Sequence, residues 1–458
     1  MQKLLFSFLL LSIVTSLYAQ EEEEEPIQNN KQFEFHSYGR IGVSSSVYEE
    51  KVGSRLNLSS QGAIGGRFEE NDYIEMTVVA NIDRLFEMEP EQPKIKFVLT
   101  TQSFSGDNTF IANNTVINFA EMYLDVSDTI FNVPLNLWVG SRYYRDRNID
   151  MADYWTFNNL TGQGFGLTVG NTQLAFVSSL VLQDQPNNPY GDELYEDGRQ
   201  KHILALQHRY HLNKYNTINF LGEYHFTGKD SLDDPVFIKD RVSDFGFVVG
   251  AMHLHQKGNF LNNASIRYGT RIANGPGDDG WSSRTFINFG NPNQTGQYIG
   301  AYGLNITENF VWDVNQKWGI MGYSVFRYAI GARNPVFVND QRPNEKWDFT
   351  IGFRPQLYIT DKLQMIFEYH YQIRDFEEYS NGIVGYNPGL GMMNKFTIAP
   401  VYVPSGERKL MARPHIRLVY TLAFYNDVVK QNGLSQYYEA GNAGDFGQYL
   451  GLKSEWWF

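Results

Sequence analysis

The residues best suited to binding chemistry lie between Leu137 and Leu167. This stretch begins as a strand and ends at three glycines, and a long loop is expected between the strand and the glycines. Such a loop is too charged for a core and too aromatic for a solvated linker. Charged groups bind hydroxyls and ring faces pack on sugar C–H surfaces, so the mixture suits a polyhydroxylated ligand. The alternative is a surface loop that only folds back on itself. The residues concerned are Arg142, Tyr143, Tyr144, Arg145, Asp146, Arg147, Asp150, Asp153, Tyr154 and Trp155.

The start of the chain indicates export from the cytoplasm. Met1–Ala19 has the features of a secretory signal peptide, because Lys3 precedes a short apolar run that ends in a small residue. Residues 20–32 contain the acidic run Glu21–Glu25 and are expected to form a disordered tail. The net charge of −13 argues against a nucleic-acid partner. With 0 cysteines, the chain is expected to form neither disulfides nor thiolate metal sites.

From Phe33 to Phe458, alternating polar and apolar residues predict an all-β outer-membrane barrel. Early examples are Phe33–Ser44, Arg55–Phe68 and Tyr73–Asp83, each long enough to cross a membrane as a tilted strand. Tight turns are expected at one end, including Gly170-Asn171 and Glu308-Asn309, and long polar loops at the other. We expect about 18 antiparallel strands, an even number with both chain ends on one side, around a water-filled lumen. Aromatic residues make up 15%, as expected for girdles at the two membrane surfaces.

Several motifs resemble the maltoporin family of sugar-selective trimeric porins. The first strand contains FHSYGRIG, and the charged loop SRYYRDRNIDMADYWTF is followed by GQGFGL. The segments TIGFRPQLY, ARPHIRLVY and the terminal SEWWF are also similar. The resemblance implies a homotrimer in the outer membrane and a loop that folds into the barrel to form the constriction. The chain ends on the aromatic Phe458, as bacterial outer-membrane barrels commonly do, and this residue is expected to be read by the barrel-assembly machinery; the alternative is a simple girdle aromatic.

The resemblance also implies roles for individual residues. The aromatic slide, along which a sugar chain moves, would include Tyr38 and Trp457, with Trp155 narrowing the pore and Phe110 lent by a neighbouring subunit. The polar track would include Arg40, Arg55, Arg145, Arg147, Asp150 and Asp153, which exchange hydrogen bonds with hydroxyls. The chain departs from the family at four positions. The family has slide aromatics where this chain has residues near Ala63 and Ala264 and where it has Met411. It has a basic track residue where this chain has Ala120.

These observations predict a passive porin for carbohydrates such as maltodextrins or other oligosaccharides, with no cofactor and no metal. Solute binding must be weak, because a tightly bound solute blocks a channel. The alternative is a general diffusion or ion-selective porin on the same scaffold. A surface adhesin or a barrel enzyme is less favoured: the sequence contains neither HExxH nor GxSxG, and alternation alone explains why His253 and His255 share one strand face.

Overall fold

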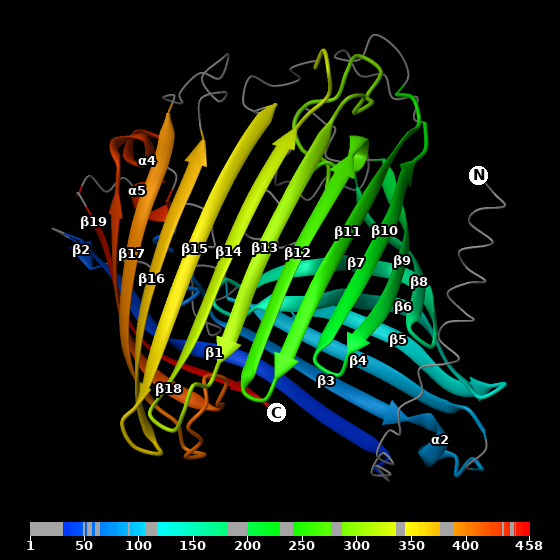
Figure 1. Ribbon diagram of the computed structural model, residues 1–458, viewed down its shortest axis with the longest axis horizontal. Helices are drawn as coiled ribbons and strands as arrows, with labels where there is room; N and C mark the ends of the chain where they lie inside the picture. The colour runs from blue at the N-terminus through cyan, green and yellow to red at the C-terminus, as the bar shows by residue number, and fades with distance from the viewer. Residues whose placement is uncertain are drawn as a thin grey trace.

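The computed structural model is a closed antiparallel β-barrel, as the sequence predicted (Figure 1). Its 19-stranded sheet contains the two-residue β2 and eighteen long wall strands. The barrel closes where β1 pairs with β19, with Tyr38 opposite Trp457. At this seam the Ser37 amide donates to the Phe458 carbonyl (2.9 Å), and the Phe458 amide donates back (3.0 Å).

The strands run almost the whole length of the described chain. The wall strands are β1 Phe33–Tyr48, β3 Tyr73–Asn81, β4 Lys94–Phe104, β5 Ile117–Ile130, β6 Val133–Ile149, β7 Tyr154–Val169, β8 Thr172–Val181, β9 Gln200–Asn213, β10 Asn216–Thr227, β11 Asp244–Lys257, β12 Phe260–Thr270, β13 Tyr302–Trp312, β14 Trp318–Ile330, β15 Glu345–Tyr358, β16 Leu363–Asp375, β17 Leu390–Tyr402, β18 His415–Tyr425 and β19 Phe446–Trp457. The short elements are β2 Lys51–Val52, α2 Ile82–Leu85, η2 Arg271–Ala273, α4 Asp427–Gln431 and α5 Gln436–Glu439. None of the helices in the described part of the chain is long and apolar enough to cross a membrane.

The structure describes residues 31–48, 51–52, 57–59, 65–89, 92–105, 117–181, 199–229, 241–275, 286–335, 344–375, 389–432, 435–439, 444 and 446–458. The expected signal peptide and nearly all of the expected acidic tail lie outside these residues.

The two ends of the barrel differ. At one end, β5–β6, β7–β8, β9–β10 and β11–β12 are joined by the tight turns 131–132, 170–171, 214–215 and 258–259. At the other end lie longer connections, such as 271–301 between β12 and β13. The turn expected at Glu308-Asn309 is wrong, because both residues continue β13 and the chain turns at 313–317. Both are polar and turn-like in type, but pairing with β12 and β14 keeps them extended.

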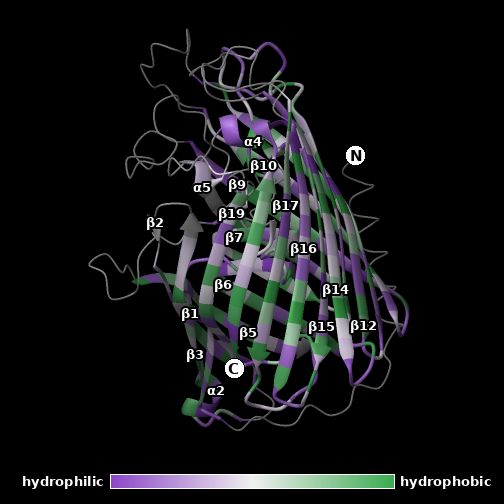
Figure 2. Ribbon diagram, turned by 90° about the vertical axis from the view of Figure 1, so that its left-hand side faces the viewer, coloured by the Kyte–Doolittle hydropathy of each residue, from purple (hydrophilic) through white to green (hydrophobic). Residues whose placement is uncertain are grey.

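Strand alternation separates a lipid-facing surface from an inner surface. On β18, Ile416 and Leu418 are 44% and 47% exposed, whereas Arg417 between them is 3% exposed. Figure 2 shows this alternation as a chequered pattern of hydrophobic and hydrophilic residues along the strands. Pairs of aromatic side chains lie at both ends of the lipid-facing surface. Tyr268 and Tyr302 (ring centroids 6.0 Å apart) lie at the loop end, and Phe260 and Trp312 (5.9 Å) lie at the turn end.

Candidate functional site

The predicted constriction is a β-hairpin inside the barrel. Pairing of β6 with β5 ends at Ser141, and pairing of β7 with β8 begins at Gln163. Between these points the two strands pair only with each other, from Arg142 opposite Gly162 to Ile149 opposite Tyr154. The expected long irregular loop is therefore wrong in form, because only residues 150–153 lie outside the strands.

One face of this inner hairpin (residues 142–162) packs against the far wall. Its tip residues Ile149, Met151, Ala152 and Tyr154 form a buried cluster with Met321, Tyr323, Val325 and Leu410. Further down, Phe157 packs with Leu221 and Met252. Asn305 donates to the Tyr154 hydroxyl (3.0 Å), and the Ser265 hydroxyl donates to the Thr156 carbonyl (3.2 Å). These contacts with β10–β14 show that the hairpin folds into the lumen, as the resemblance implied.

The tip is held by an arginine cluster around Asp150. The side chain of Asp150 lies 3.5 Å from Arg67, 3.5 Å from Arg354 and 3.9 Å from Arg413. Arg67 also donates to the Asp150 carbonyl (3.3 Å). Further carboxylates balance this cluster, since Arg67 contacts Glu70 and Glu455, Arg354 contacts Glu368, and Arg413 contacts Glu455.

A second inward segment, residues 57–59 and 65–72, covers the wall formed by β15–β19. Lys395 donates to Glu69 (2.7 Å), to the Ser59 hydroxyl (3.0 Å) and to the Gly66 carbonyl (3.2 Å). The guanidinium groups of Arg354 (4.5 Å) and Arg417 (4.6 Å) both lie over the Phe68 ring. The strand predicted for Arg55–Phe68 is therefore wrong in the described part, whose alternating residues pack inside the barrel.

The seam between β1 and β19 brings together three of the predicted site residues. Tyr38 and Trp457 are register partners, and the Tyr38 hydroxyl donates to Glu455 (3.2 Å). Arg40 forms an ion pair with Glu70 (3.2 Å) and lies 5.3 Å from the centre of the Tyr73 ring. Arg413 lies 4.3 Å from the centre of the Trp457 ring.

The other predicted site residues that the structure describes lie on the inner hairpin. The Arg145 guanidinium lies over the rings of Tyr143 (3.9 Å from the ring centre) and Trp155 (4.2 Å). Arg147 contacts Asp146 (3.4 Å), and Asp153 accepts a hydrogen bond from Asn148 (2.8 Å). Two predicted residues, Arg55 and Phe110, lie outside the described residues, as does the departure at Ala63.

The electrostatic environment keeps Asp153 ionised. Burial alone would raise the pKa of its carboxyl, but the guanidinium groups of Arg67 and Arg40 outweigh burial and hold that pKa below its usual range. The ionised carboxylate therefore stabilises the tip fully above the usual aspartate pKa. This contribution is lost as the pH falls through the lowered value.

Some residues on the inner surface were not singled out from the sequence. Tyr73, Gln102 and Glu121 line the wall opposite the exposed face of the hairpin, and the Tyr143 hydroxyl donates to Gln102 (2.5 Å). A signal for Tyr73 was present, since it lies two residues before the charged Glu75 in the strand predicted for Tyr73–Asp83, and residues two apart share a strand face. Gln102 and Glu121 meet Tyr143 only because the hairpin turns inward, which no local pattern encodes.

The structure also locates two residues at which the chain departs from the family pattern, Ala264 and Met411. Ala264 shares the outward face of β12 with Ile266 and Tyr268, which are 50% and 42% exposed. Met411 lies in the connection 403–414 between β17 and β18, at the turn end of the barrel. Ala264 therefore faces away from the constriction, whereas Met411 adjoins Leu410, which packs with the hairpin tip.

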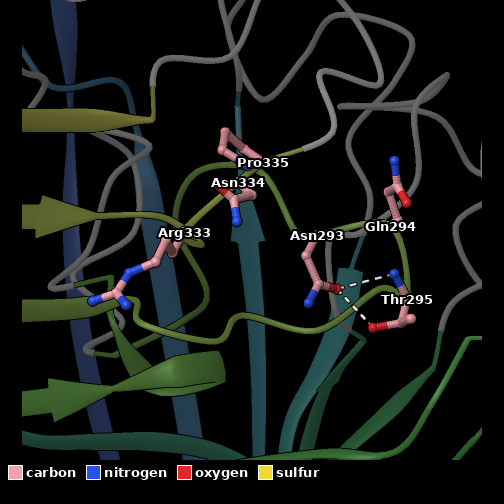
Figure 3. A pocket seen from close by; sticks show the side chains of 6 residues that line it. All are labelled: Asn293, Gln294, Thr295, Arg333, Asn334 and Pro335. Carbon is pink, nitrogen blue, oxygen red and sulfur yellow. Dashed lines mark hydrogen bonds between the residues drawn. The ribbon is translucent and has the colours of Figure 1, made fainter.

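A polar hollow of about 540 Å³ lies at the loop end of the barrel (Figure 3). It is lined by Asn293, Gln294, Thr295, Arg333, Asn334 and Pro335. The side-chain oxygen of Asn293 (Oδ1) accepts from the Thr295 amide (3.0 Å) and hydroxyl (2.8 Å). Since none of the six lining side chains is aromatic, the hollow offers hydrogen bonds but no stacking surface.

Gly140 is placed where β6 is about to leave the wall. Its φ of +136° is rare for other residues, and an added Cβ would lie 2.3 Å from the Met122 carbonyl oxygen. We therefore expect Gly140→Ala to lower the free energy of unfolding by about 1–3 kcal/mol. The measurement is urea unfolding of the detergent-solubilised barrel. The matched control is Gly222→Ala, whose added Cβ meets nothing within 4 Å; equal losses in both variants would contradict the expectation.

Comparisons with known proteins agree with this architecture. The LamB porin family model matches residues 33–458. A maltoporin of Vibrio cholerae serotype O1 strain N16961 is 26% identical over 310 residues, covering 64% of this chain and 67% of that protein. The maltoporin of strain O395 has the same identity and is covered over 66% of its length. These matches therefore span about two thirds of the relatives.

Solved structures give weaker likenesses. OccK10 (OpdN) of Pseudomonas aeruginosa has a TM-score of 0.45 at 10% identity, with 93% of this chain and 99% of that chain covered. At such a score the likeness adds nothing to the assignment. The family match extends from the first wall strand to the last residue, and it is the finding that identifies the protein. The chain belongs to the LamB porin family, and it is an outer-membrane channel rather than an enzyme.

Proposed function

We propose that this porin is a passive channel selective for carbohydrates, and that linear oligosaccharides bind weakly as they cross the constriction. The observation that carries the proposal is the contact of Arg145 with the rings of both Tyr143 and Trp155 on the partly exposed face of the inner hairpin. Ring faces pack on sugar C–H surfaces, and a stacked guanidinium directs its N–H donors outward in the ring plane. The relatives named maltoporin support the same solute class.

The energetics fit a permeating solute. A millimolar dissociation constant corresponds to about −4 kcal/mol. Two or three stacked ring faces, with hydrogen bonds that compete with water, are sufficient for that free energy. Tighter binding would slow release and turn the solute into a blocker.

The test is single-channel conductance of the purified mature protein in a planar bilayer, titrated with linear oligosaccharides. We expect a saturable block that deepens with chain length, because longer chains occupy more of the constriction. Matched neutral solutes of the same mass, such as short polyethylene glycols, should produce no saturable block. An identical response to sugars and polyethylene glycols would favour the general diffusion porin instead.

We also propose how the protein oligomerises and how it is inserted into the outer membrane. We infer a homotrimer, which should migrate as a single heat-dissociable species on a native gel. We also infer that Phe458, which is 66% exposed beside Phe35, is the residue that the barrel-assembly machinery reads. Deleting Phe458 should then lower the amount of folded protein in the outer membrane, and unchanged amounts would refute this role.

A further inference from the structure

The inner surface of the barrel is unevenly covered. Inward side chains on β15–β19 are almost fully buried beneath the second inward segment and the hairpin tip. These include Asp348, Thr350, Gln364, His370, Gln372, Lys395 and Thr421, each 0% exposed. Inward side chains on β3–β6 are mostly partly exposed; these include Tyr73, Glu75, Gln102, Glu121, Tyr123, Asp125 and Arg142. Solvent therefore reaches the inner surface mainly along β3–β6.

Two tyrosines on this open side are fixed by one glutamine. The Tyr73 hydroxyl lies 2.8 Å from Gln102 Oε1 and 2.6 Å from Glu75 Oε2. The Tyr143 hydroxyl donates to the same Gln102 oxygen (2.5 Å), and the Tyr143 amide donates to Glu121 (2.9 Å). Because these bonds fix the rings before a solute arrives, stacking costs little conformational entropy.

Arg145 supplies the donors at this place. It contacts the rings of Tyr143 and Trp155, and no carboxylate lies within ion-pair distance of it among the residues that the structure describes. By contrast, Arg40, Arg67, Arg142, Arg354, Arg413 and Arg417 each have a carboxylate within 4.0 Å. The N–H donors of Arg145 are thus available to a solute.

We propose that the principal sugar-binding site lies on the open side, formed by Tyr73, Glu75, Gln102, Tyr143 and Arg145, and that it takes neutral pyranosyl units of linear oligosaccharides. This inference rests on the proposed carbohydrate function and assigns it to residues other than the family's slide positions. The rings of Tyr73 and Tyr143 provide the stacking surface, Glu75 accepts from hydroxyls, and Arg145 donates to them.

Charge explains the preference for neutral sugars. A uronate that approached Arg145 would also approach Glu75 and Glu121, both of which lie within hydrogen-bond distance of Tyr73 or Tyr143. A cationic sugar would meet Arg145 in the same way. Hydroxyl groups, which both donate and accept, satisfy both kinds of partner at once.

Trp457 is a poorer stacking surface, although the resemblance gives it that role. Arg413 covers its ring at 4.3 Å, and Arg413 is itself held by Glu455 at 3.1 Å with only 3% of its side chain exposed. A sugar could stack on that face only after displacing a buried, ion-paired arginine. Arg40 lies farther from the Tyr73 ring (5.3 Å), and Arg145, at 3.9 Å from the Tyr143 ring, is held by no carboxylate among the described residues.

The first test compares sugar block in planar bilayers between the wild type and variants at Tyr73, Tyr143 and Trp457. Tyr143→Leu and Tyr73→Leu should each weaken block by a linear neutral oligosaccharide about tenfold, whereas Trp457→Leu should change it less than twofold. Tyr143→Phe keeps the ring and should retain most of the block, which separates stacking from a shifted hairpin. The control is Tyr369→Leu on the lipid-facing side of β16. Strong loss in Trp457→Leu with none at the two tyrosines would overturn the inference.

The outcomes separate this inference from the proposed function. If the wild-type channel shows no sugar block, both fail. If the wild type is blocked but Tyr73→Leu and Tyr143→Leu behave as the wild type does, only the location fails. A uronate oligomer of equal length should block more weakly than the neutral one, and stronger block would overturn the neutral preference.

The second test uses the absence of native cysteine from the chain. Glu75→Cys should react rapidly with a charged methanethiosulfonate reagent added to the open channel, and a saturating neutral oligosaccharide should slow the reaction. Thr350→Cys, at a 0% exposed inward position on β15, should remain unmodified. Equal labelling of both positions, or no protection of position 75, would overturn the inference.

Discussion

Replacing Asp150 with alanine is expected to increase the mean conductance and the open-channel noise. Three guanidinium groups meet at this carboxylate, and together they tie the tip of the inner hairpin to β15, to the 403–414 connection and to the second inward segment. Loss of a largely buried charge partner costs about 3 kcal/mol, enough to let the tip leave the lumen part of the time. Single-channel recording at low and high salt measures the effect.

Asp146→Ala is the matched control for Asp150→Ala. Asp146 lies on the same hairpin, but among the described residues its carboxylate forms an ion pair only with Arg147 (3.4 Å), and both side chains are partly exposed. Its removal should change stability by less than about 1 kcal/mol and leave the conductance as in the wild type. If the two variants show the same current, the cluster around Asp150 does not hold the tip.

The second large effect is expected for Lys395→Met. Lys395 and Glu69 form an ion pair in which neither side chain is exposed, and the same ammonium group also binds Ser59 and the Gly66 carbonyl. Removing the lysine leaves a buried carboxylate without its counter-ion, which costs about 3–5 kcal/mol. Residues 57–59 and 65–72 should then detach from β15–β19, which opens a second path and raises the conductance.

The double variant Lys395→Met, Glu69→Met decides whether the unpaired charge is the cause. Removing both partners restores neutrality and keeps apolar volume, so most of the lost stability and the original conductance should return. A cysteine introduced at Ser59 reports the same event, since it should be labelled in Lys395→Met and protected in the double variant. If the double variant conducts as Lys395→Met does, the segment is held by other contacts.

The barrel could be predicted because its cause is local. Each wall strand meets lipid on one face and the lumen on the other, so the period of two appears in the sequence wherever a strand crosses the membrane. The same rule failed for Arg55–Phe68. Leu58 and Phe68 alternate with polar residues there because they pack against the inner wall rather than against lipid.

The candidate site was only partly predictable. The stacking of Arg145 with Trp155 joins residues of one hairpin, and their presence in one charged and aromatic stretch indicated binding. The cluster around Asp150 joins that hairpin to Arg67, Arg354 and Arg413, which are distant in sequence. Such contacts depend on how far the hairpin reaches across the lumen, and no spacing in a single sequence records that distance.

The pairing limits of the inner hairpin have an evolutionary consequence. Strands β5 to β8 remain joined through Ser141 and Gln163, so the wall is complete without residues 142–162. The constriction and the barrel wall are therefore encoded by separate parts of the chain. Changes in the length or composition of the hairpin can therefore alter which solutes enter the cell without altering the barrel wall that keeps the membrane closed.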